Sequence, residues 1–326
     1  MNFYEQEEKF KSNYNKKFKF KHVKKKCLCF NTNHIKLFNL DRYNLKTSVV
    51  LCDKCGLVYS NKVLGNLDLS EFYSSDSYRH FYNILSSNND GDFVDSQYHD
   101  TVSIKEPLAI IQRCIPHINN LNILDFGAGY AQLSRTLNKD NNLICIDQSK
   151  KTIESLNKDG IKAYSGGVEI LKELNYQYDL IILSHVVEHF YDFNKELQTI
   201  MNYLKQDGFI YIEVPNLDVK YNMDQIQNAH NYYFTKNTLF YFASKLGLQT
   251  NIYSENVNKL HLGGMFFKKN NKFKYSKADE INKIRNYHKS LYTLNVKLEK
   301  INIYVREKIK FFLGVKLTAR FRKLIN

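Results

Sequence analysis

The sequence has 326 residues, 43% of them hydrophobic and 14% aromatic, which is enough for one large domain with appendages or for two domains. It contains no apolar run of about 18 residues, so we expect no membrane-spanning helix. The lysine-rich first 30 residues lack the apolar stretch of a secretory signal, and we therefore expect a cytoplasmic protein whose cysteines are reduced.

The formal net charge of +14 is concentrated at the two ends of the chain. Residues 1–30 carry +6 and residues 268–326 carry +13, whereas the part between them carries −5. A nucleic-acid enzyme usually has a basic face beside its active site, so we expect no specific nucleic-acid partner. The basic ends suit an anionic membrane surface, a polyanionic partner or solvation alone.

Residues 1–66 are predicted to form a small cysteine-rich module. It holds four of the six cysteines, Cys27, Cys29, Cys52 and Cys55. Four thiolates in two close pairs are typical of a structural, tetrahedral zinc site. The first pair is C-x-C, one residue shorter than usual, so His22 or His34 is an alternative ligand. Idle or buried thiols are the alternative to a metal.

A polar, tyrosine-rich connector follows over residues 67–101. Tyr78 and Tyr82, together with Tyr73, are candidates for the wall of a substrate pocket. Tyrosine is common throughout the chain, so ordinary packing is the alternative for each. Residues 102–117 then have apolar side chains at helical spacing, which predicts a helix that covers a sheet.

Residues 122–147 are predicted to form a strand, a tight glycine turn, a helix and a second strand. The first strand contains Asp125, and Gly127 and Gly129 follow it at once. Glycine lets the chain turn sharply and lets a ligand approach the backbone closely. The second strand ends in Asp147, 20 residues after Gly127, where nucleotide-binding βαβ units place an acid that binds ribose hydroxyls.

The alternation of helices and strands continues after this unit. A dinucleotide fingerprint requires a third glycine, but residue 132 is glutamine, which weakens the prediction of a pyrophosphate ligand. The expected elements are a helix over 148–159, a strand over 161–164, a strand over 179–184, a helix over 194–204 and a strand over 209–214. In an open α/β sheet, ligands bind at the carboxyl ends of the strands.

These motifs resemble the class I methyltransferases that use S-adenosylmethionine, whose signature is an apolar strand, Asp/Glu-x-Gly-x-Gly and an acid at the end of strand two. The resemblance implies an α/β fold with a Rossmann-like, seven-stranded methyltransferase sheet over residues 102–270. It also implies S-adenosylmethionine as the cofactor. The implied donor-binding residues are Asp125, Gly127, Gly129, Asp147, Ser184 and His185.

Three later strings are similar to a subgroup of sugar C-methyltransferases that carry an N-terminal zinc module. They are S-H-V-V-E-H-F at 184–190, A-H-N-Y-Y-F-T at 229–235 and H-L-G-G at 261–264. His230 matches the second histidine of the subgroup's H-E-H triplet, whereas the first is Asn228. The H-L-G-G string has one residue more than the subgroup's H-G-G. The resemblance implies zinc in the N-terminal module and C- or O-methylation of a sugar nucleotide or glycan precursor.

Two other functions stay open at this point. The acceptor can be another small metabolite or a lipid-linked or phosphorylated molecule. Alternatively, the chain is a nucleic-acid-binding or scaffold protein that keeps the fold without the activity. The acidic middle of the chain argues against this last function.

Proton removal from an acceptor calls for a base, and a histidine of near-neutral pKa suits that task. We rank His230 first, then His189, then His185, with a purely structural histidine as the alternative for each. Tyr233, beside His230, is expected to contact the substrate. Glu188 is expected to order the loop.

The end of the chain, residues 276–326, is predicted to be a basic helical tail. Apolar side chains at alternating spacings of four and three form a heptad seam over residues 287–305. This seam predicts either a homodimer or a helix that folds back on the domain. Residues 315–325 are short, basic and amphipathic, which is consistent with weak contact with a membrane surface.

Overall fold

The computed structural model describes residues 22–42, 46–65, 71, 73, 102–219, 225–269 and 272–291. Two substrate candidates, Tyr78 and Tyr82, lie outside these residues, as do the basic end of the chain and most of the heptad seam. Within the described part, no helix combines the length and the apolar character that crossing a membrane requires.

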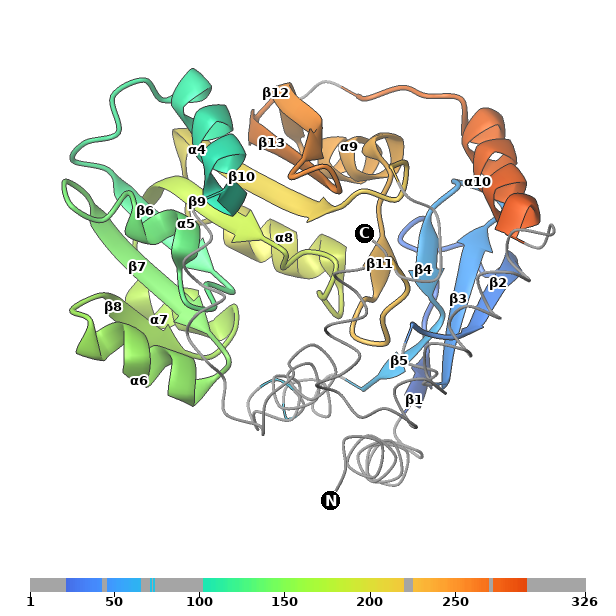
Figure 1. Ribbon diagram of the computed structural model, residues 1–326, viewed down its shortest axis with the longest axis horizontal. Coiled ribbons are helices and arrows are strands. Elements are labelled where there is room, and N and C mark those ends of the chain that lie inside the picture. Colours follow the sequence, from blue (N-terminus) through green and yellow to red (C-terminus); the bar gives the residue numbers. More distant parts are fainter. Residues whose placement is uncertain are drawn as a thin grey trace, which may run out of the picture.

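A seven-stranded sheet forms the centre of the molecule, in the order β12-β13-β10-β9-β6-β7-β8 (Figure 1). The strands from β8 to β10 pair in parallel, and β13 runs antiparallel between β10 and β12. This order confirms the predicted Rossmann-like methyltransferase sheet. The strands are β6 Asn122–Phe126, β7 Asn142–Asp147, β8 Lys162–Ser165, β9 Tyr178–Ser184, β10 Leu204–Pro215, β12 Leu248–Val257 and β13 His261–Lys268.

Helices cover both faces of this sheet, because its strands bury side chains on both sides. Ile182 packs in the cluster beneath one group of helices, whereas its neighbour Ile181 packs in the cluster beneath the other. The first group is α4 Val102–Cys114, α5 Gln132–Arg135 and α6 Lys150–Lys158. The second group is α7 Glu169–Leu174, α8 Phe193–Met201 and α9 Lys236–Lys245.

The largest difference from the predicted boundaries lies between α8 and β10. The helix ends at Met201 instead of continuing to residue 204. Leu204 instead pairs with Tyr178 of β9, so that β10 begins before the turn at residues 206–208 and changes register across it.

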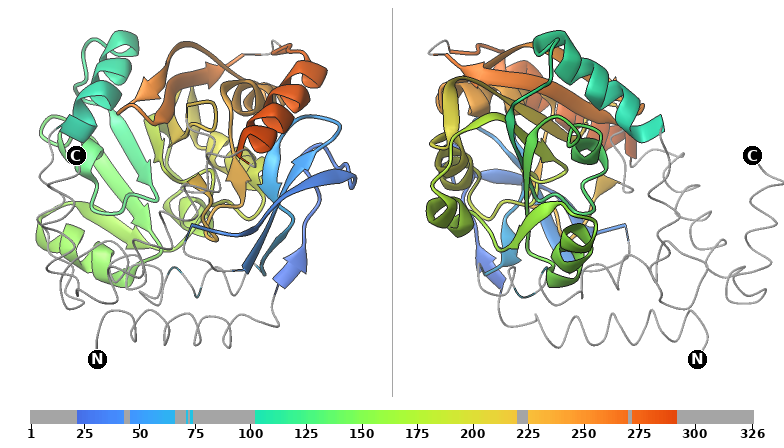
Figure 2. Two further views of the ribbon diagram at one scale, coloured as in Figure 1. Left: turned by 45° about the vertical axis from the view of Figure 1, so that its right-hand side comes forward. Right: turned by 90° about the vertical axis from the view of Figure 1, so that its left-hand side faces the viewer.

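The N-terminal module is completed by a segment from the central part of the chain. Its four-stranded sheet has the order β11-β4-β3-β2, and β11 comes from the loop that follows β10. The strands are β2 His34–Leu40, β3 Lys46–Cys52, β4 Val58–Ser60 and β11 Tyr232–Tyr233, beside a separate pair of β1 His22–Lys24 and β5 Lys62–Leu64. The two regions predicted as separate domains therefore share a sheet, as Figure 2 shows from two further sides.

The described start of the tail, α10 Lys277–Leu291, folds back onto this module. Ile281 and Ile284 are buried against the β2–β3–β4 layer, and Tyr287, the first residue of the heptad seam, packs beside them. The buried Glu280 carboxylate accepts hydrogen bonds from Thr235 Oγ1 at 2.6 Å and Asn237 Nδ2 at 2.9 Å. The described part of the tail is thus attached within one chain, and the other seam residues lie outside the described range.

Candidate active site

The glycine turn after β6 closes on the end of β7. Gly127 and Gly129 have φ angles of 71° and 53°, a left-handed conformation that glycine adopts without strain. The Asp147 carboxylate accepts hydrogen bonds from the amides of Gly129 and Ser149, each at 2.9 Å. Gly127, Gly129 and Asp147, three of the residues predicted to bind the donor, therefore lie together at the carboxyl ends of two parallel strands.

Asp125 differs from the other residues of this turn because it lies inside the protein. It is 5% exposed, and Ser134 Oγ donates a hydrogen bond to its Oδ2 at 2.5 Å. Burial raises the pKa of Asp125 to about 7; the Ser134 hydrogen bond opposes this change, and the nearby Asp147 charge adds to it. Asp125 thus supports the turn from beneath.

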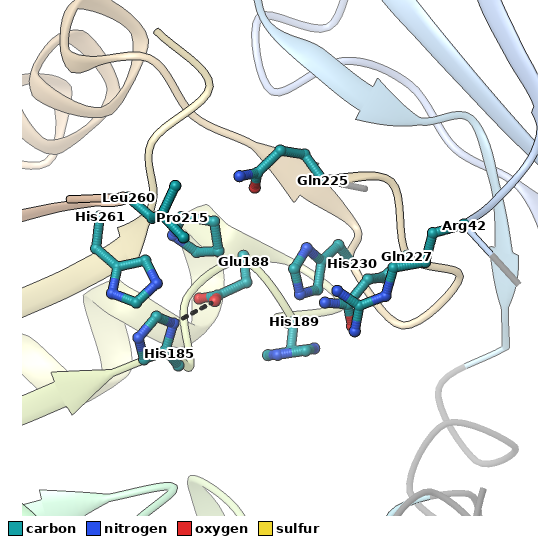
Figure 3. A pocket seen from close by; sticks show the side chains of 10 residues that line it. All are labelled: Arg42, His185, Glu188, His189, Pro215, Gln225, Gln227, His230, Leu260 and His261. Atoms are coloured by element: carbon teal, nitrogen blue, oxygen red, sulfur yellow. Dashed lines mark ion pairs between the residues drawn. The ribbon is translucent and has the colours of Figure 1, made fainter. Parts of the chain in front are cut away.

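A polar cavity of about 420 Å³ lies beyond the carboxyl ends of β9 and β10. We call it the acceptor pocket. The loop after β9, which supplies part of its wall, packs against the donor turn, because a Cβ on Gly127 would be 2.5 Å from Val186 Cγ2. The lining residues of the pocket are Arg42, His185, Glu188, His189, Pro215, Gln225, Gln227, His230, Leu260 and His261 (Figure 3).

Four of the lining residues are histidines, and they form two pairs with Glu188 between them (Figure 3). The rings of His185 and His261 pack edge to face, with their centroids 4.3 Å apart. The rings of His189 and His230 pack in the same way at 4.8 Å. The Glu188 side chain is 2% exposed, and neither of its oxygens has a hydrogen-bond partner in the described part of the chain.

The first pair faces a second buried carboxylate, Glu213 of β10. Glu213 Oε1 lies 3.0 Å from His261 Nδ1 and 3.6 Å from His185 Nε2. Its Oε2 accepts hydrogen bonds from Tyr211 at 2.9 Å and Ser184 at 3.3 Å. Ser184, predicted to bind the donor, therefore contacts a residue of the acceptor side.

His185 begins the loop after β9 in a left-handed conformation, with a φ of 55°. Its amide donates to the Glu213 carbonyl at 2.9 Å, which fixes this unusual geometry. Burial lowers the pKa of His185, but the nearby carboxylates of Glu188 and Glu213 outweigh it and raise the pKa to about 10. With no cation bound, His185 therefore keeps its proton at neutral pH, which argues against its predicted role as the base.

The second pair is held in the opposite charge state. Burial lowers the pKa of His189, and burial with the neighbouring His189 lowers the pKa of His230 well below its usual range. His189 Nδ1 lies 3.0 Å from the Ala229 carbonyl, which accepts its proton and leaves the lone pair on Nε2. The Tyr73 hydroxyl lies 2.8 Å from the same Nδ1. Both histidines are therefore neutral near pH 7, as a proton acceptor must be.

Tyr233 lies behind His230 instead of lining the pocket. It is 4% exposed, its ring centroid is 5.8 Å from that of His230, and its hydroxyl donates to the Gln227 carbonyl at 2.8 Å. This position suits a residue that supports His230 and does not fit the predicted contact with substrate.

Comparison with known proteins identifies the central part of the chain. Residues 98–250 match a family model described as a methyltransferase domain. This part of the chain is therefore a methyltransferase domain. No curated protein matches the sequence.

The chain is also similar to solved methyltransferase structures. One is the 1,6-didemethyltoxoflavin-N1-methyltransferase of Burkholderia thailandensis with bound S-adenosylhomocysteine, at 13% identity and a TM-score of 0.48, covering 72% of this chain and 100% of that one. Another is the magnesium protoporphyrin IX methyltransferase of Synechocystis PCC 6803, at 12% identity and a TM-score of 0.45, covering 62% of this chain and 99% of that one.

In the N-terminal module of the methyltransferase, the four predicted cysteines come together. Their Sγ atoms all lie within 4.8 Å of one another, with Cys27 and Cys55 3.4 Å apart and Cys29 and Cys52 3.6 Å apart. Both thiols of the shortened C-x-C pair, Cys27 and Cys29, therefore belong to this cluster. His34, an alternative ligand, instead pairs its Nδ1 with the Thr32 carbonyl and its Nε2 with Asn61. The side chain of His22, the other alternative, is not described.

Several pocket residues of the methyltransferase did not emerge from the sequence. Glu213 had a readable signal, because it is a single carboxylate within the apolar strand FIYIEV. His261 stood in a motif but had no assigned role. Arg42, Gln225 and Gln227 had no signal, since only the contact of the N-terminal module with the loop after β10 brings them to the pocket.

Proposed function

We propose that the methyltransferase transfers the methyl group of S-adenosylmethionine to a sugar nucleotide or glycan precursor held in the acceptor pocket. The observation that carries this proposal is the neutral histidine pair, His189 and His230, in a polar cavity whose wall includes the loop that packs against the donor turn. A cavity of this volume suits a small molecule. Arg42 in its wall favours an acceptor that carries phosphate.

The chemistry follows from this arrangement. The methyl group of a sulfonium is already activated, so the protein mainly aligns donor and acceptor and excludes water. We assign the role of base to His230, because its imidazole is neutral, 4% exposed and has no hydrogen-bond partner in the described part of the chain. His189 is the next candidate. The proton of the acceptor passes to this base as the methyl group arrives.

We also propose that the cysteine cluster holds one structural zinc ion. Four thiolates leave no open position for catalysis, which is typical of structural sites. The strand β4 begins three residues after Cys55, and Ser60 at its end binds the loop of the base: Ser60 Oγ donates to the His230 carbonyl at 2.9 Å. The ion would thereby help to hold His230 over the acceptor pocket.

The test of the proposed function is mass spectrometry of products after incubation with labelled donor. The panel contains nucleotide sugars, lipid-linked phosphosugars and unphosphorylated sugars. We expect methylation of a nucleotide sugar, and its loss in His230→Ala. Methylation of only the lipid-linked compounds would move the acceptor to the second class named above. No labelled product, together with binding of DNA or RNA that falls steeply with salt, would favour the non-catalytic alternative.

A further inference from the structure

The acceptor pocket contains a group of side chains that its methyl-transfer chemistry leaves unexplained. His185, His261 and Glu213 offer ligand atoms that all lie within 4.8 Å of one another. Two imidazoles and one carboxylate on one face are a recurrent ligand set for divalent transition metals, both in zinc enzymes and in non-haem iron enzymes. We propose that these three residues bind a divalent transition-metal ion that contacts the acceptor.

The distances around Glu213 suit a shared ion. Ligand atoms about 2.1 Å from a central ion lie roughly 3–3.5 Å from one another. Glu213 Oε1 is 3.0 Å from His261 Nδ1 and 3.6 Å from His185 Nε2. The second of these separations is too long for a hydrogen bond but compatible with two ligands of one ion.

The surroundings of the three ligands are those of a prepared site. Tyr211 and Ser184 bind Glu213 Oε2, so that Oε1 faces the imidazoles. Gly263 leaves room for this arrangement, because a Cβ there would lie 2.9 Å from the Tyr211 hydroxyl oxygen. Outer hydrogen bonds of this kind orient metal ligands.

Glu188 provides the second, independent observation. It is 1% exposed, neither oxygen has a hydrogen-bond partner in the described part of the chain, and its carboxylate points into the pocket (Figure 3). Its Oε1 lies 3.5 Å from His185 Nδ1, the ring nitrogen opposite the one that faces Glu213. A carboxylate behind the second nitrogen of a ligating histidine is common in metal sites. A bound cation would also compensate the two buried carboxylates, Glu188 and Glu213.

The access to the site fits a role in binding the acceptor. The side chains of His185 and His261 are 39% and 25% exposed, so the face opposite Glu213 is open to the cavity. An acceptor hydroxyl bound there would lose its proton more easily. The proton passes to His230, the oxygen forms a bond to the methyl carbon, and the bond from that carbon to sulfur breaks with its electron pair on sulfur. This consequence, but not the ion itself, rests on the proposed function.

The experiment is a titration of full-length, zinc-loaded protein with Mn²⁺ and, separately, Co²⁺, followed by metal analysis and calorimetry without acceptor. We expect one ion per chain beyond the zinc of the cysteine cluster. His261→Asn and Glu213→Gln should abolish this binding. Glu188→Gln should weaken it by about 10- to 100-fold, as for other second partners of metal ligands. His230→Asn, on the other side of Glu188, should leave the ion bound.

Each outcome of this titration decides the proposal. The proposal would be overturned if the wild-type protein bound neither Mn²⁺ nor Co²⁺. It would also be overturned if His230→Asn lost the ion while His261→Asn still bound it. His261 is partly exposed, so its variant tests the site even where Glu213→Gln does not fold; unchanged donor affinity would confirm that each variant is folded. If protein without this second ion still methylates a compound of the panel, only the proposed metal site is wrong and the proposed function stands. If the second ion binds but no nucleotide sugar is methylated, only the proposed class of acceptor is wrong and the proposed metal site stands.

Discussion

The two halves of the active site are built in opposite ways. The donor half uses one continuous stretch, from Asp125 to Ser149, and its hydrogen bonds join residues within this stretch. The acceptor half collects residues from β10, from the loops after β9 and β10, from the start of β13 and from the N-terminal module. The comparison teaches that the donor half depends on local geometry, whereas the acceptor half depends on contacts between distant segments.

The largest expected effect tests whether the two halves can be separated. Cys52→Ser should remove the proposed zinc ion and unfold the N-terminal sheet, because structural zinc sites contribute on the order of 10 kcal/mol to folding. Turnover should then be lost while the affinity for S-adenosylmethionine changes little. Metal analysis, thermal unfolding and calorimetry measure the three quantities, and Cys114→Ser, outside the cluster, is the control. An equal loss of donor affinity in Cys52→Ser would show that the halves fold as one unit.

The same comparison explains what the sequence could and could not predict. The turn at Gly127 and Gly129 was readable because its chemistry, two glycines between two acids, lies within 25 residues. The pairing of β11 with β4 was not readable, because Tyr232 and Tyr59 are distant in sequence and either tyrosine suits many environments. The sequence left the packing of α10 open between a homodimer and a fold back on the domain for a related reason: the seam from Tyr287 is apolar whichever surface it packs on.

The charge states of the histidines could not be predicted either. His185 and His189 stand four residues apart in one loop, yet their pKa values move in opposite directions. The carboxylates of Glu188 and of Glu213, which comes from another strand, lie beside His185 and raise its pKa, whereas burial dominates at His189. A motif gives the residue type, but the tertiary environment sets its proton affinity.

The next effect concerns the base of the acceptor half. His230→Ala should lower turnover by about 10²–10⁴-fold, or roughly 3–5 kcal/mol of barrier, because a positioned base is removed. His230→Gln keeps much of the shape and should lose nearly as much. Donor affinity should stay close to that of wild type in both, as calorimetry can show. Wild-type turnover in both variants would transfer the role to His189, and lower thermal stability with weaker donor binding would instead indicate a structural histidine.

A pH effect belongs to the donor half, through Asp125. Burial raises the pKa of this carboxyl from its ordinary value of 3.8 to about 7 in the folded protein, so the native state favours the protonated form. Its contribution to stability is full below about pH 4 and is lost as the pH rises toward 7, by about 4 kcal/mol at most.

Asp125→Asn keeps the size of this side chain and cannot ionise. Relative to wild type, the variant should therefore gain stability as the pH rises from 5 to 8, measured by urea unfolding at both values. Ser134→Ala, which removes the hydroxyl that donates to Asp125 and to the Ala131 carbonyl, is the matched comparison. A difference between Asp125→Asn and wild type that is the same at both pH values would assign the titration to another group.

The smallest effect addresses the donor directly, at Asp147. Both carboxylate oxygens already accept a backbone amide, from Gly129 and Ser149, and this fixes the carboxylate at the end of β7. A carboxylate oxygen can accept more than one hydrogen bond, so a ribose hydroxyl of S-adenosylmethionine is the further donor expected here. Asp147→Ala should weaken donor binding by roughly 1.5–3 kcal/mol, the range for hydrogen bonds to a charged group. Asp147→Asn keeps one acceptor oxygen, so its affinity for the donor should lie between those of wild type and Asp147→Ala.

Calorimetry with S-adenosylmethionine and with S-adenosylhomocysteine decides how this loss arises. Ribose is common to both ligands, so the loss should be equal for the two if Asp147 binds its hydroxyls. A larger loss for the positively charged S-adenosylmethionine would mean that the carboxylate acts through its charge. Equal affinity of Asp147→Ala and wild type would remove Asp147 from the donor site. The role of this carboxylate would then be only to close the turn, through the hydrogen bonds that it accepts from the amides of Gly129 and Ser149.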